Sequence, residues 1–375
     1  MKKLANFGKL ALASLLSLSL IACGGDEEAN SDNSTQAAAP AAKAEPIEWK
    51  MVTTWPKNFP ALGTGAQSLA DSITAMSGGR LNVKVYAAGE LVPALEAFDA
   101  VSRGTAQMGH AASYYWKGKV PAAQFFTSTP FGLTAQEMNS WLHSGGGLEL
   151  WEEVYEPFNI IPMAAGNSGA QMGGWFNKEI NSLEDLQGLK MRMPGIGGEV
   201  MARAGATIVN LPGSEMFTAL QTGTIDATEW VGPYNDLAFG IYKAAKYYYY
   251  PGWQEPGSTI ETFINKDAFE ALPEDLQLIV RAAARQANAE MLDEFTALNN
   301  SALETLINEH NVNLKRFPDA VLAELRTTSD EVLADIAAKD PMSQKVYNSM
   351  QAFKTKVEAW HEVSERAIIN ARAGD

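Results

Sequence analysis

A ten-residue pattern occurs twice in this chain, and it restricts the possible folds more than any other feature of the sequence. Residues 96–105 and 215–224 share the form E-x-F-x-A-x-x-x-G-T. A second similarity lies upstream, where alternating patterns at 81–85 and 189–193 each precede a glycine-rich turn and a helical stretch. Two copies of a strand–helix–strand unit, one in each of two lobes, predict an α/β fold with mostly parallel sheets.

Further strands and helices are expected around the two copies. An apolar share of 46% in 375 residues is enough for two hydrophobic cores. Ile160 to Ala165 reads as a buried strand, and we expect it to carry the chain into the second lobe. Alternation and capping signals predict the other strands at 47–51 and 81–86, and helices at 62–76, 93–103, 134–144 and 147–158.

A single long helix is predicted from Pro273 to about Glu309, and its length of about 55 Å exceeds the width of a small lobe. Such a helix could brace both lobes. Helical stretches at 318–338 and 341–371 end the chain, either as a docking or dimer element or as packing on a lobe. The expected organisation is lobe I at 47–160 with part of 250–300, lobe II at 161–249 with part of 301–340, and a C-terminal helical element at 341–375.

The N-terminus has the pattern of an export signal. Lys2, Lys3 and Lys9 precede an apolar run at 10–22, which is too short to span a bilayer. Cys23, the lone cysteine, follows Leu20-Ile21-Ala22 and resembles the lipid-modified cysteine of the bacterial lipobox. We therefore expect a lipoprotein signal peptide at 1–22, a lipid anchor at Cys23, a flexible tether through 46 and a periplasmic, membrane-anchored protein; the alternative is an ordinary signal peptide.

Composition excludes several kinds of function. A net charge of −15 would repel nucleic acid. One cysteine permits neither an intrachain disulfide nor a cysteine-based zinc site, and the four histidines have no metal-ligand spacing. The chain also lacks a Gly-x-Ser-x-Gly elbow, a P-loop and a His-Glu-x-x-His motif, so we do not expect an enzyme.

Arg192 is the first candidate binding residue. Alternation places it opposite Met191 and Met193, at the end of a strand and before a turn. Ligands bind at that end of strands in open α/β sheets, and a guanidinium matches a carboxylate as a planar fork. The alternative is an ordinary surface arginine.

Two further features could form a pocket. Asp226 to Pro233 places acids beside Trp230 at a strand end, where they could coordinate a hard cation or hydrogen-bond a ligand; the alternative is an edge-strand acid. Aromatic residues are also dense, as suits a small-ligand pocket or packing between lobes. They lie at 114–116, 175–176, 247–250 and 253.

Several segments together resemble the DctP-type solute-binding proteins of the TRAP (tripartite ATP-independent periplasmic) transporters. They are Gln171 to Lys178, Leu189 to Arg192, Gly223 to Pro233 and Tyr248 to Trp253. The resemblance covers about 47–371 and is strongest to the subgroup that binds 2-oxo acids or lactate with a metal ion. It implies two α/β lobes of the periplasmic-binding-protein type that close on a ligand, a long helix crossing both lobes, and C-terminal helices that can form a swapped dimer.

The resemblance also implies roles for individual residues. Arg192 occupies the position that pairs with the substrate carboxylate. Gln171, Glu229 and the backbone carbonyl of Trp230 would hold a Na⁺ or Ca²⁺ ion that also touches the substrate. Glu255 falls where a further metal ligand or substrate contact is expected, and Tyr114 and Tyr115 would be first-lobe substrate contacts.

The sequence therefore predicts a receptor that binds a small monocarboxylate, a 2-oxo acid such as pyruvate or a 2-hydroxy acid such as lactate, with a cation. It would deliver the ligand to the small and large membrane subunits of a TRAP permease. Three alternatives stay open: a receptor of the same fold for an aromatic acid or polyol, a secreted metal-dependent enzyme using Glu229 and Glu255, and a structural lipoprotein without a ligand.

Overall fold

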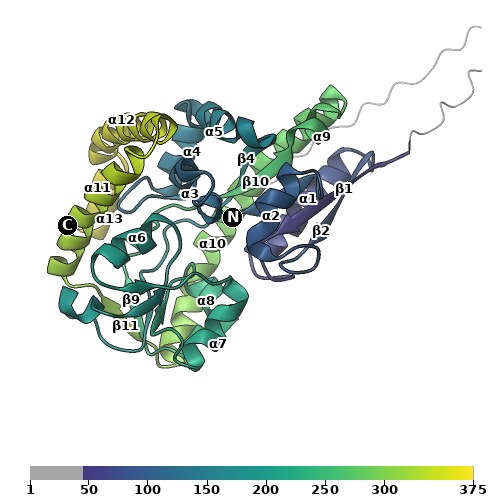
Figure 1. The fold of residues 1–375 in the computed structure, drawn as a ribbon. Coiled ribbons are helices and arrows are strands. Elements are labelled where there is room, and N and C mark those ends of the chain that lie inside the picture. The colour runs from purple at the N-terminus through teal and green to yellow at the C-terminus, as the bar shows by residue number, and fades with distance from the viewer. Residues whose placement is uncertain (1–44, 375) are drawn as a thin grey trace, which may run out of the picture. The chain divides into compact units, whose positions relative to one another are not determined.

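The computed structural model of this protein describes residues 45–374. The expected signal peptide, Cys23 and the tether up to residue 44 lie outside the described residues. Within 45–374, the helices are all too short or too polar to cross a membrane. The description below concerns this part of the chain (Figure 1).

A five-stranded sheet forms the first lobe, with the strand order β2-β1-β3-β10-β4. β1 is parallel to both β2 and β3, whereas β10 runs antiparallel to β3 and β4. The strands are β1 (Ile47–Thr53), β2 (Leu81–Tyr86), β3 (Met108–Ala111), β4 (Ile160–Asn167) and β10 (Thr259–Asn265).

A six-stranded sheet forms the second lobe, with the order β7-β6-β8-β5-β9-β11. β6 is parallel to β7 and β8, and β5 runs antiparallel to β8 and β9. The strands are β5 (Gly174–Phe176), β6 (Lys190–Arg192), β7 (Thr207–Ile208), β8 (Ala227–Thr228), β9 (Tyr247–Tyr250) and β11 (Asn313–Arg316).

The two sheets contain the same unit, which extends well beyond the repeated ten residues. In each lobe the chain runs strand, helix, strand, helix, strand, and the first strand lies between the other two. The units are β1–α1–β2–α2–β3 and β6–α6–β7–α7–β8. Their helices are α1 (Leu62–Met76), α2 (Ala97–Ser102), α6 (Gly195–Arg203) and α7 (Met216–Gln221).

The repeated motif corresponds to the second helix of each unit. Both copies begin at the last residue of a 3₁₀ turn, continue as a short α-helix and stop at a glycine. Gly104 and Gly223 have φ of 75° and 72°, a left-handed conformation that glycine adopts without strain and that ends a helix sharply.

The two similar segments upstream of the repeated motif do not occupy equivalent positions in the two sheets. We expected 189–193 to correspond to 81–85, which form β2. Instead β6 occupies the central position that β1 occupies in the first sheet, since each is flanked by the other two strands of its unit. Alternation marks each of these segments as a strand but does not identify its neighbours.

The chain also enters the second sheet later than expected. β4 pairs with β10 over its whole length, so residues 161–167, which the sequence assigned to lobe II, extend the first sheet. The crossover follows Asn167. β10 belongs to the first sheet and β11 to the second, although both lie late in the chain.

The long helix α10 (Glu274–Asn308) has 35 residues, close to the predicted 273–309. It packs against β4 and α1 of the first lobe and against α8 (Pro233–Phe239) of the second (Figure 1), so it does cross both lobes. The α/β fold class with two lobes and a long bridging helix is therefore confirmed.

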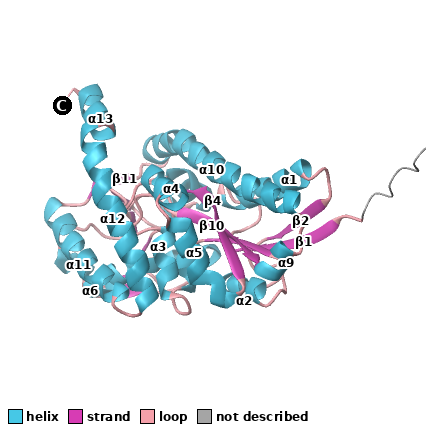
Figure 2. Ribbon diagram, turned by 90° about the horizontal axis from the view of Figure 1, so that it is seen from above, coloured by secondary structure: helices cyan, strands magenta, loops and turns pink. Residues whose placement is uncertain are grey.

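The C-terminal helices follow α10 (Figure 2). α12 packs against α11, α4 and α5. The helix expected at 341–371 is interrupted at Ser364, whose φ of −123° and ψ of −101° are not helical. The helices not yet given are α3 (Gln124–Thr127), α4 (Ala135–Ser144), α5 (Gly147–Tyr155), α9 (Lys266–Glu270), α11 (Asp319–Ala337), α12 (Pro341–Val363) and α13 (Glu365–Ala373).

One of the apolar clusters joins the lobes. Trp55 and Phe59, which follow β1, pack with Trp230 and Phe239 of the second lobe. The Phe59 and Phe239 ring centroids are 4.2 Å apart, and Trp55 lies 6.2 Å from Trp230. The two lobes are thus in contact, and the residues between them are shielded from solvent.

Candidate functional site

Arg192 lies at the end of β6 and is 1% exposed, so it is not a surface arginine. Its Nη1 donates to the backbone carbonyl of Glu229 at 2.7 Å and lies 3.4 Å from Oε2 of the same residue. Its Nη2 donates to the Tyr115 hydroxyl of the other lobe at 3.4 Å. The guanidinium also faces the Trp230 ring at 5.2 Å. These contacts present a planar cation to the space between the lobes.

Glu229 directly follows β8, the neighbour of β6, and is fully buried. It begins the segment 229–231, whose backbone is fixed at both ends by hydrogen bonds. The Glu229 amide donates to the Arg192 carbonyl at 3.0 Å, and the Val231 carbonyl accepts from the Met172 amide at 3.0 Å. Between them, the Trp230 carbonyl has no hydrogen-bond donor among the described residues.

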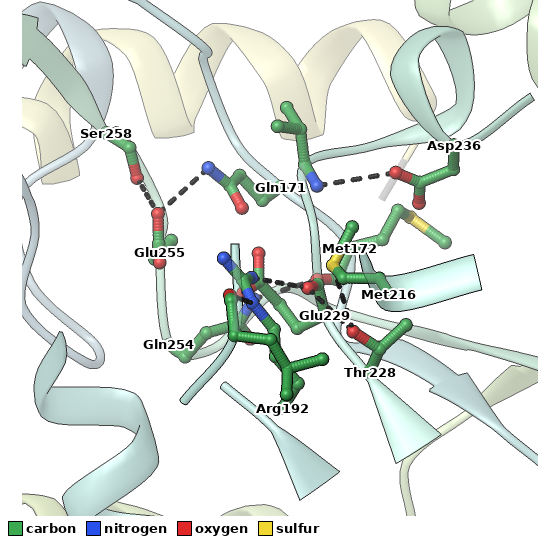
Figure 3. A network of polar contacts seen from close by, with 12 residues as sticks. Gln171, Met172, Arg192, Met216, Thr228, Glu229, Asp236, Gln254, Glu255 and Ser258 are labelled. Carbon is green, nitrogen blue, oxygen red and sulfur yellow. Dashed lines mark hydrogen bonds and ion pairs between the residues drawn. The ribbon is translucent and has the colours of Figure 1, made fainter. Parts of the chain in front are cut away.

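Gln171 and Glu255 form a second polar pair beside this segment (Figure 3). The Gln171 Nε2 donates to Glu255 Oε2 at 2.9 Å and to the Ser168 hydroxyl at 3.0 Å. The Ser258 hydroxyl donates to the same Glu255 oxygen. Both amide hydrogens of Gln171 are therefore used, which leaves its oxygen as the free atom.

Two buried side-chain oxygens of the site lack a partner: Gln171 Oε1 and Glu229 Oε1. An unpaired buried acceptor is costly, because it has lost its hydrogen bonds to water. Together with the Trp230 carbonyl, these atoms form a set of neutral and anionic oxygens of the kind that Na⁺ and Ca²⁺ prefer. The residues present thus fit the expected cation. Within 45–374, no group of three or more His, Cys, Asp or Glu side chains could hold a metal ion, so a cation here would also need the amide and carbonyl oxygens.

The electrostatics of the site point the same way. Burial, then the nearby Glu255, raises the pKa of Glu229 well above its ordinary value, and Arg192 only partly opposes this. Burial raises the pKa of Glu255 to about 7 against the hydrogen bond from Ser258, the charge of Arg192 and the hydrogen bond from Gln171. Two buried carboxylates thus share one guanidinium. A cation held between them would favour their ionised forms.

The first-lobe tyrosines lie where the sequence placed them. They belong to a turn that follows β3. The Tyr115 hydroxyl accepts from Arg192, and the Tyr114 ring packs against Gly195, where an added Cβ would lie 3.2 Å from the ring. Gly195 has a φ of 64° and begins α6, so a glycine suits both the backbone and the close approach.

An ion pair spans the lobes beside these tyrosines. The Lys117 Nζ donates to Glu199 Oε1 at 2.9 Å and to the Gly195 carbonyl at 3.1 Å, both on α6. A cavity of about 150 Å³ lies next to it, lined by residues of both lobes including Tyr114, Tyr115 and Met193. Lys117 therefore links the two lobes at the lining of this cavity.

Other candidates from the sequence lie outside the site. Asp226 accepts from the backbone amide of Lys190 at 3.0 Å and is partly exposed. Trp175 stacks on Tyr248 in the second sheet, with ring centroids 4.0 Å apart. Trp253 stacks on Phe131. Trp175 and Tyr248 thus pack within the second sheet, whereas Tyr115 and Trp230 border the site.

Sequence reasoning also missed residues that shape the site. Trp55 lies between Tyr115 and Trp230, with ring centroids 6.4 and 6.2 Å away. Its indole donates to His110 Nδ1 at 2.8 Å. Ser258 was missed as well. None of these residues belongs to a local motif, and a tryptophan two residues after a strand signals no particular role.

Comparison with known proteins gives a consistent result. Residues 51–340 match the family model of the bacterial extracellular solute-binding proteins, family 7 (DctP). The monocarboxylate 2-oxoacid-binding periplasmic protein of Nostoc sp. is 45% identical over 86% of this chain and 88% of its own length.

Solved structures resemble this chain equally well. A TRAP periplasmic solute-binding protein of Pseudoalteromonas atlantica, with bound sodium and pyruvate, is 44% identical, with a TM-score of 0.85 over 87% of this chain and 99% of its own. One from Colwellia psychrerythraea, with bound calcium and pyruvate, is 43% identical, with a TM-score of 0.85 over 87% of this chain and 100% of its own.

Proposed function

Because this chain belongs to the bacterial extracellular solute-binding proteins of family 7, we propose that it is an extracytoplasmic receptor for a small monocarboxylate. The ligand is a 2-oxo acid such as pyruvate or a 2-hydroxy acid such as lactate, bound together with Na⁺ or Ca²⁺. The receptor delivers it to a TRAP permease in the membrane and does not convert it chemically. The pyruvate and cations in the similar structures support this assignment.

The observation that carries the proposal is the pairing of one buried guanidinium with unpartnered oxygens. Arg192 would bind the carboxylate of the acid through its planar fork. Gln171 Oε1, Glu229 Oε1 and the Trp230 carbonyl would hold the cation, with Glu255 as a further acidic ligand or substrate contact. The cation supplies positive charge, which allows Glu229 to lie near a second carboxylate without net repulsion.

Closure of the lobes would complete the site. Tyr114 and Tyr115 come from the first lobe, while Arg192, Glu229 and Trp230 come from the second. The Tyr115 hydroxyl already contacts Arg192, so the closed arrangement excludes water from the guanidinium and strengthens its attraction for a carboxylate.

A thermal-shift titration of the purified protein tests this function. Pyruvate, lactate, an aromatic acid and a polyol are compared, each with chelator, with sodium and with calcium. A ligand that binds the folded state raises the Tm. We expect a large shift with pyruvate or lactate that requires a cation. A shift only with the aromatic acid or the polyol would overturn the substrate, and turnover of the bound acid would favour an enzyme.

We also propose that Cys23 carries a lipid anchor, on the strength of the preceding Leu20-Ile21-Ala22. Replacing Cys23 by Ser should abolish incorporation of labelled fatty acid into the protein, because no thiol is left to carry an acyl chain. Equal labelling of the two forms, or no labelling of the wild type, would contradict the anchor.

A second copy of this chain is the proposed partner of the C-terminal helices. Trp360, Val363, Ile368 and Ile369 are each more than half exposed on α12 and α13. Such an apolar face is characteristic of an interaction surface. Light scattering should find a dimer for the wild type and a monomer for Ile368→Asp; a monomeric wild type would contradict the proposal.

A further inference from the structure

Asp236 is a buried carboxylate behind the cation site that the function described above does not use. It lies on α8 and is 1% exposed. No lysine or arginine pairs with it in the part of the chain that the structure describes. A buried charge without an opposite charge is costly and needs strong hydrogen bonds to persist.

The hydrogen bonds to Asp236 come from a rigid part of the second sheet. Its Oδ2 accepts from the Trp175 indole at 2.9 Å and from the Tyr248 hydroxyl at 2.6 Å. Trp175 and Tyr248 are cross-strand partners on β5 and β9, and their rings stack. The carboxylate therefore has one fixed position relative to the sheet.

The other oxygen of Asp236 contacts the backbone next to the cation site. Its Oδ1 accepts from the Val231 amide at 3.4 Å (Figure 3). Val231 is the residue after Trp230, whose carbonyl is unpartnered, and two after Glu229. Together with the Glu229–Arg192 and Val231–Met172 hydrogen bonds, this contact fixes the backbone on both sides of the Trp230 carbonyl.

We propose that Asp236 is a positioning residue for the cation: it holds the backbone at 229–231 so that the Trp230 carbonyl and the Glu229 carboxylate face the ion, and its charge adds to their attraction for it. The inference rests on the proposed function. Hydrogen-bond partners behind metal ligands orient them in many metal sites.

The chain contains a matched control in the first lobe. Glu261 on β10 is also fully buried, and it also accepts from one tryptophan indole and one tyrosine hydroxyl. The Trp116 indole lies at 2.6 Å and the Tyr155 hydroxyl at 2.9 Å. Glu261 makes no contact with the segment at 229–231, so Glu261→Gln changes a carboxyl of similar burial and hydrogen bonding without touching the proposed site.

The test compares wild type, Asp236→Asn and Glu261→Gln by calorimetry. Metal-free protein is titrated with calcium alone, and calcium-saturated protein is then titrated with pyruvate. Asp236→Asn should weaken calcium binding by roughly 10- to 100-fold, as loss of such a partner does elsewhere. Pyruvate affinity at saturating calcium should change little. Glu261→Gln should leave both affinities unchanged.

The possible outcomes separate the inference from the function on which it rests. Calcium binding by Asp236→Asn equal to that of Glu261→Gln would overturn the inference alone. Equal losses of calcium and pyruvate affinity would indicate general damage and would also overturn it. A wild type that binds neither ion nor pyruvate would overturn the proposed function and the inference together.

Tyr248→Phe serves if Asp236→Asn does not fold. It removes one donor to Asp236 and keeps both the charge and the aromatic stacking. We expect a smaller loss of calcium affinity with pyruvate binding at saturating calcium preserved. Calcium binding equal to that of the wild type would count against a positioning role.

Discussion

The two repeated units place different chemistry at the same position. His110 in the first unit lies 119 residues before Glu229 in the second, the spacing that separates the two copies of the ten-residue pattern. Both residues are fully buried. Both nitrogens of His110 have protein partners, the Trp55 indole at 2.8 Å and the Ala165 carbonyl at 3.5 Å. Glu229 instead keeps one oxygen free.

The neighbouring strands differ in the same way. Val52 on β1 pairs in register with Gly109, and Arg192 on β6 pairs with Thr228. These two pairs are equivalent in the two units, so Val52 and Arg192 occupy matching positions. Val52 belongs to the hydrophobic core, whereas Arg192 is the residue proposed to bind the carboxylate. The repeated unit thus supplies the framework twice, whereas Arg192 and Glu229 both come from the second copy.

The strongest test of this difference is the pair Arg192→Ala and Val52→Ala. Removing one partner of a buried, hydrogen-bonded charge pair costs about 2–5 kcal/mol, so Arg192→Ala should lose pyruvate binding by at least that amount. Val52→Ala should lower only the free energy of unfolding. Calorimetry and urea unfolding measure the two effects. Retained pyruvate binding in Arg192→Ala would contradict the assignment of the carboxylate-binding role to Arg192.

A second test uses pH. Burial lowers the pKa of His110 to about 4, against the hydrogen bond to Ala165, while the unfolded value is near 6.5. Between these values the unfolded chain binds more protons, so the free energy of unfolding falls as the pH falls, by about 3 kcal/mol in total. His110→Asn lacks this titration, and the stability advantage of the wild type over it should shrink from pH 6.5 to pH 4. Urea unfolding of the cation-free protein across that range measures it; parallel curves would contradict a neutral, buried His110.

The third test exchanges the two matching side chains separately. Glu229→Gln should weaken calcium binding by more than the roughly 10- to 100-fold typical of losing a partner behind a ligand, since it removes a charged ligand itself. His110→Asn should leave calcium binding unchanged and lower stability, because His110 has no free atom toward the ion. Calcium titrations of both variants decide between them, and a loss of calcium affinity in His110→Asn would show that the first unit also contributes to the site.

The smallest expected effect concerns contact between the lobes. Lys117→Ala removes the ion pair with Glu199, which is about a third exposed and therefore worth roughly 0.5–1 kcal/mol. Pyruvate should dissociate a few times faster because the closed form is less stable. Lys119→Ala is the control, since Lys119 pairs with Asp99 inside the first lobe. Stopped-flow dissociation should separate the variants; equal rates would exclude a contribution to closure.

Much of the fold could be predicted because it depends on local signals. The helix at 273–309 has continuous helical composition and differs from α10 by one residue at each end. The copies at 96–105 and 215–224 carry their own glycine stops. The boundary at 160 and the equivalence of 81–85 with 189–193 failed because strand pairing depends on distant partners: β4 pairs with β10, which lies about a hundred residues later.

The candidate site could also be predicted only where its residues lie in local motifs. Arg192 ends a strand, and Glu229 and Trp230 follow one, all within recognisable segments, so their positions could be predicted, and the structure does bring them together. Asp236 could not be found, because an aspartate in the first turn of a helix is usually exposed. Only the packing of α8 against the sheet buries it beside Trp175 and Tyr248.

The late position of β10 has a consequence for how this chain folds. In the first sheet, β3 pairs with β10, and paired residues such as Ala111 and Glu261 lie about 150 residues apart in the sequence. Until the chain is synthesised past Asn265, β3 has a free edge and the first lobe is incomplete. Contacts of such separation slow folding. The first lobe therefore cannot complete its sheet from a contiguous stretch of chain, and a fragment ending after β9 would expose that unpaired edge to aggregation.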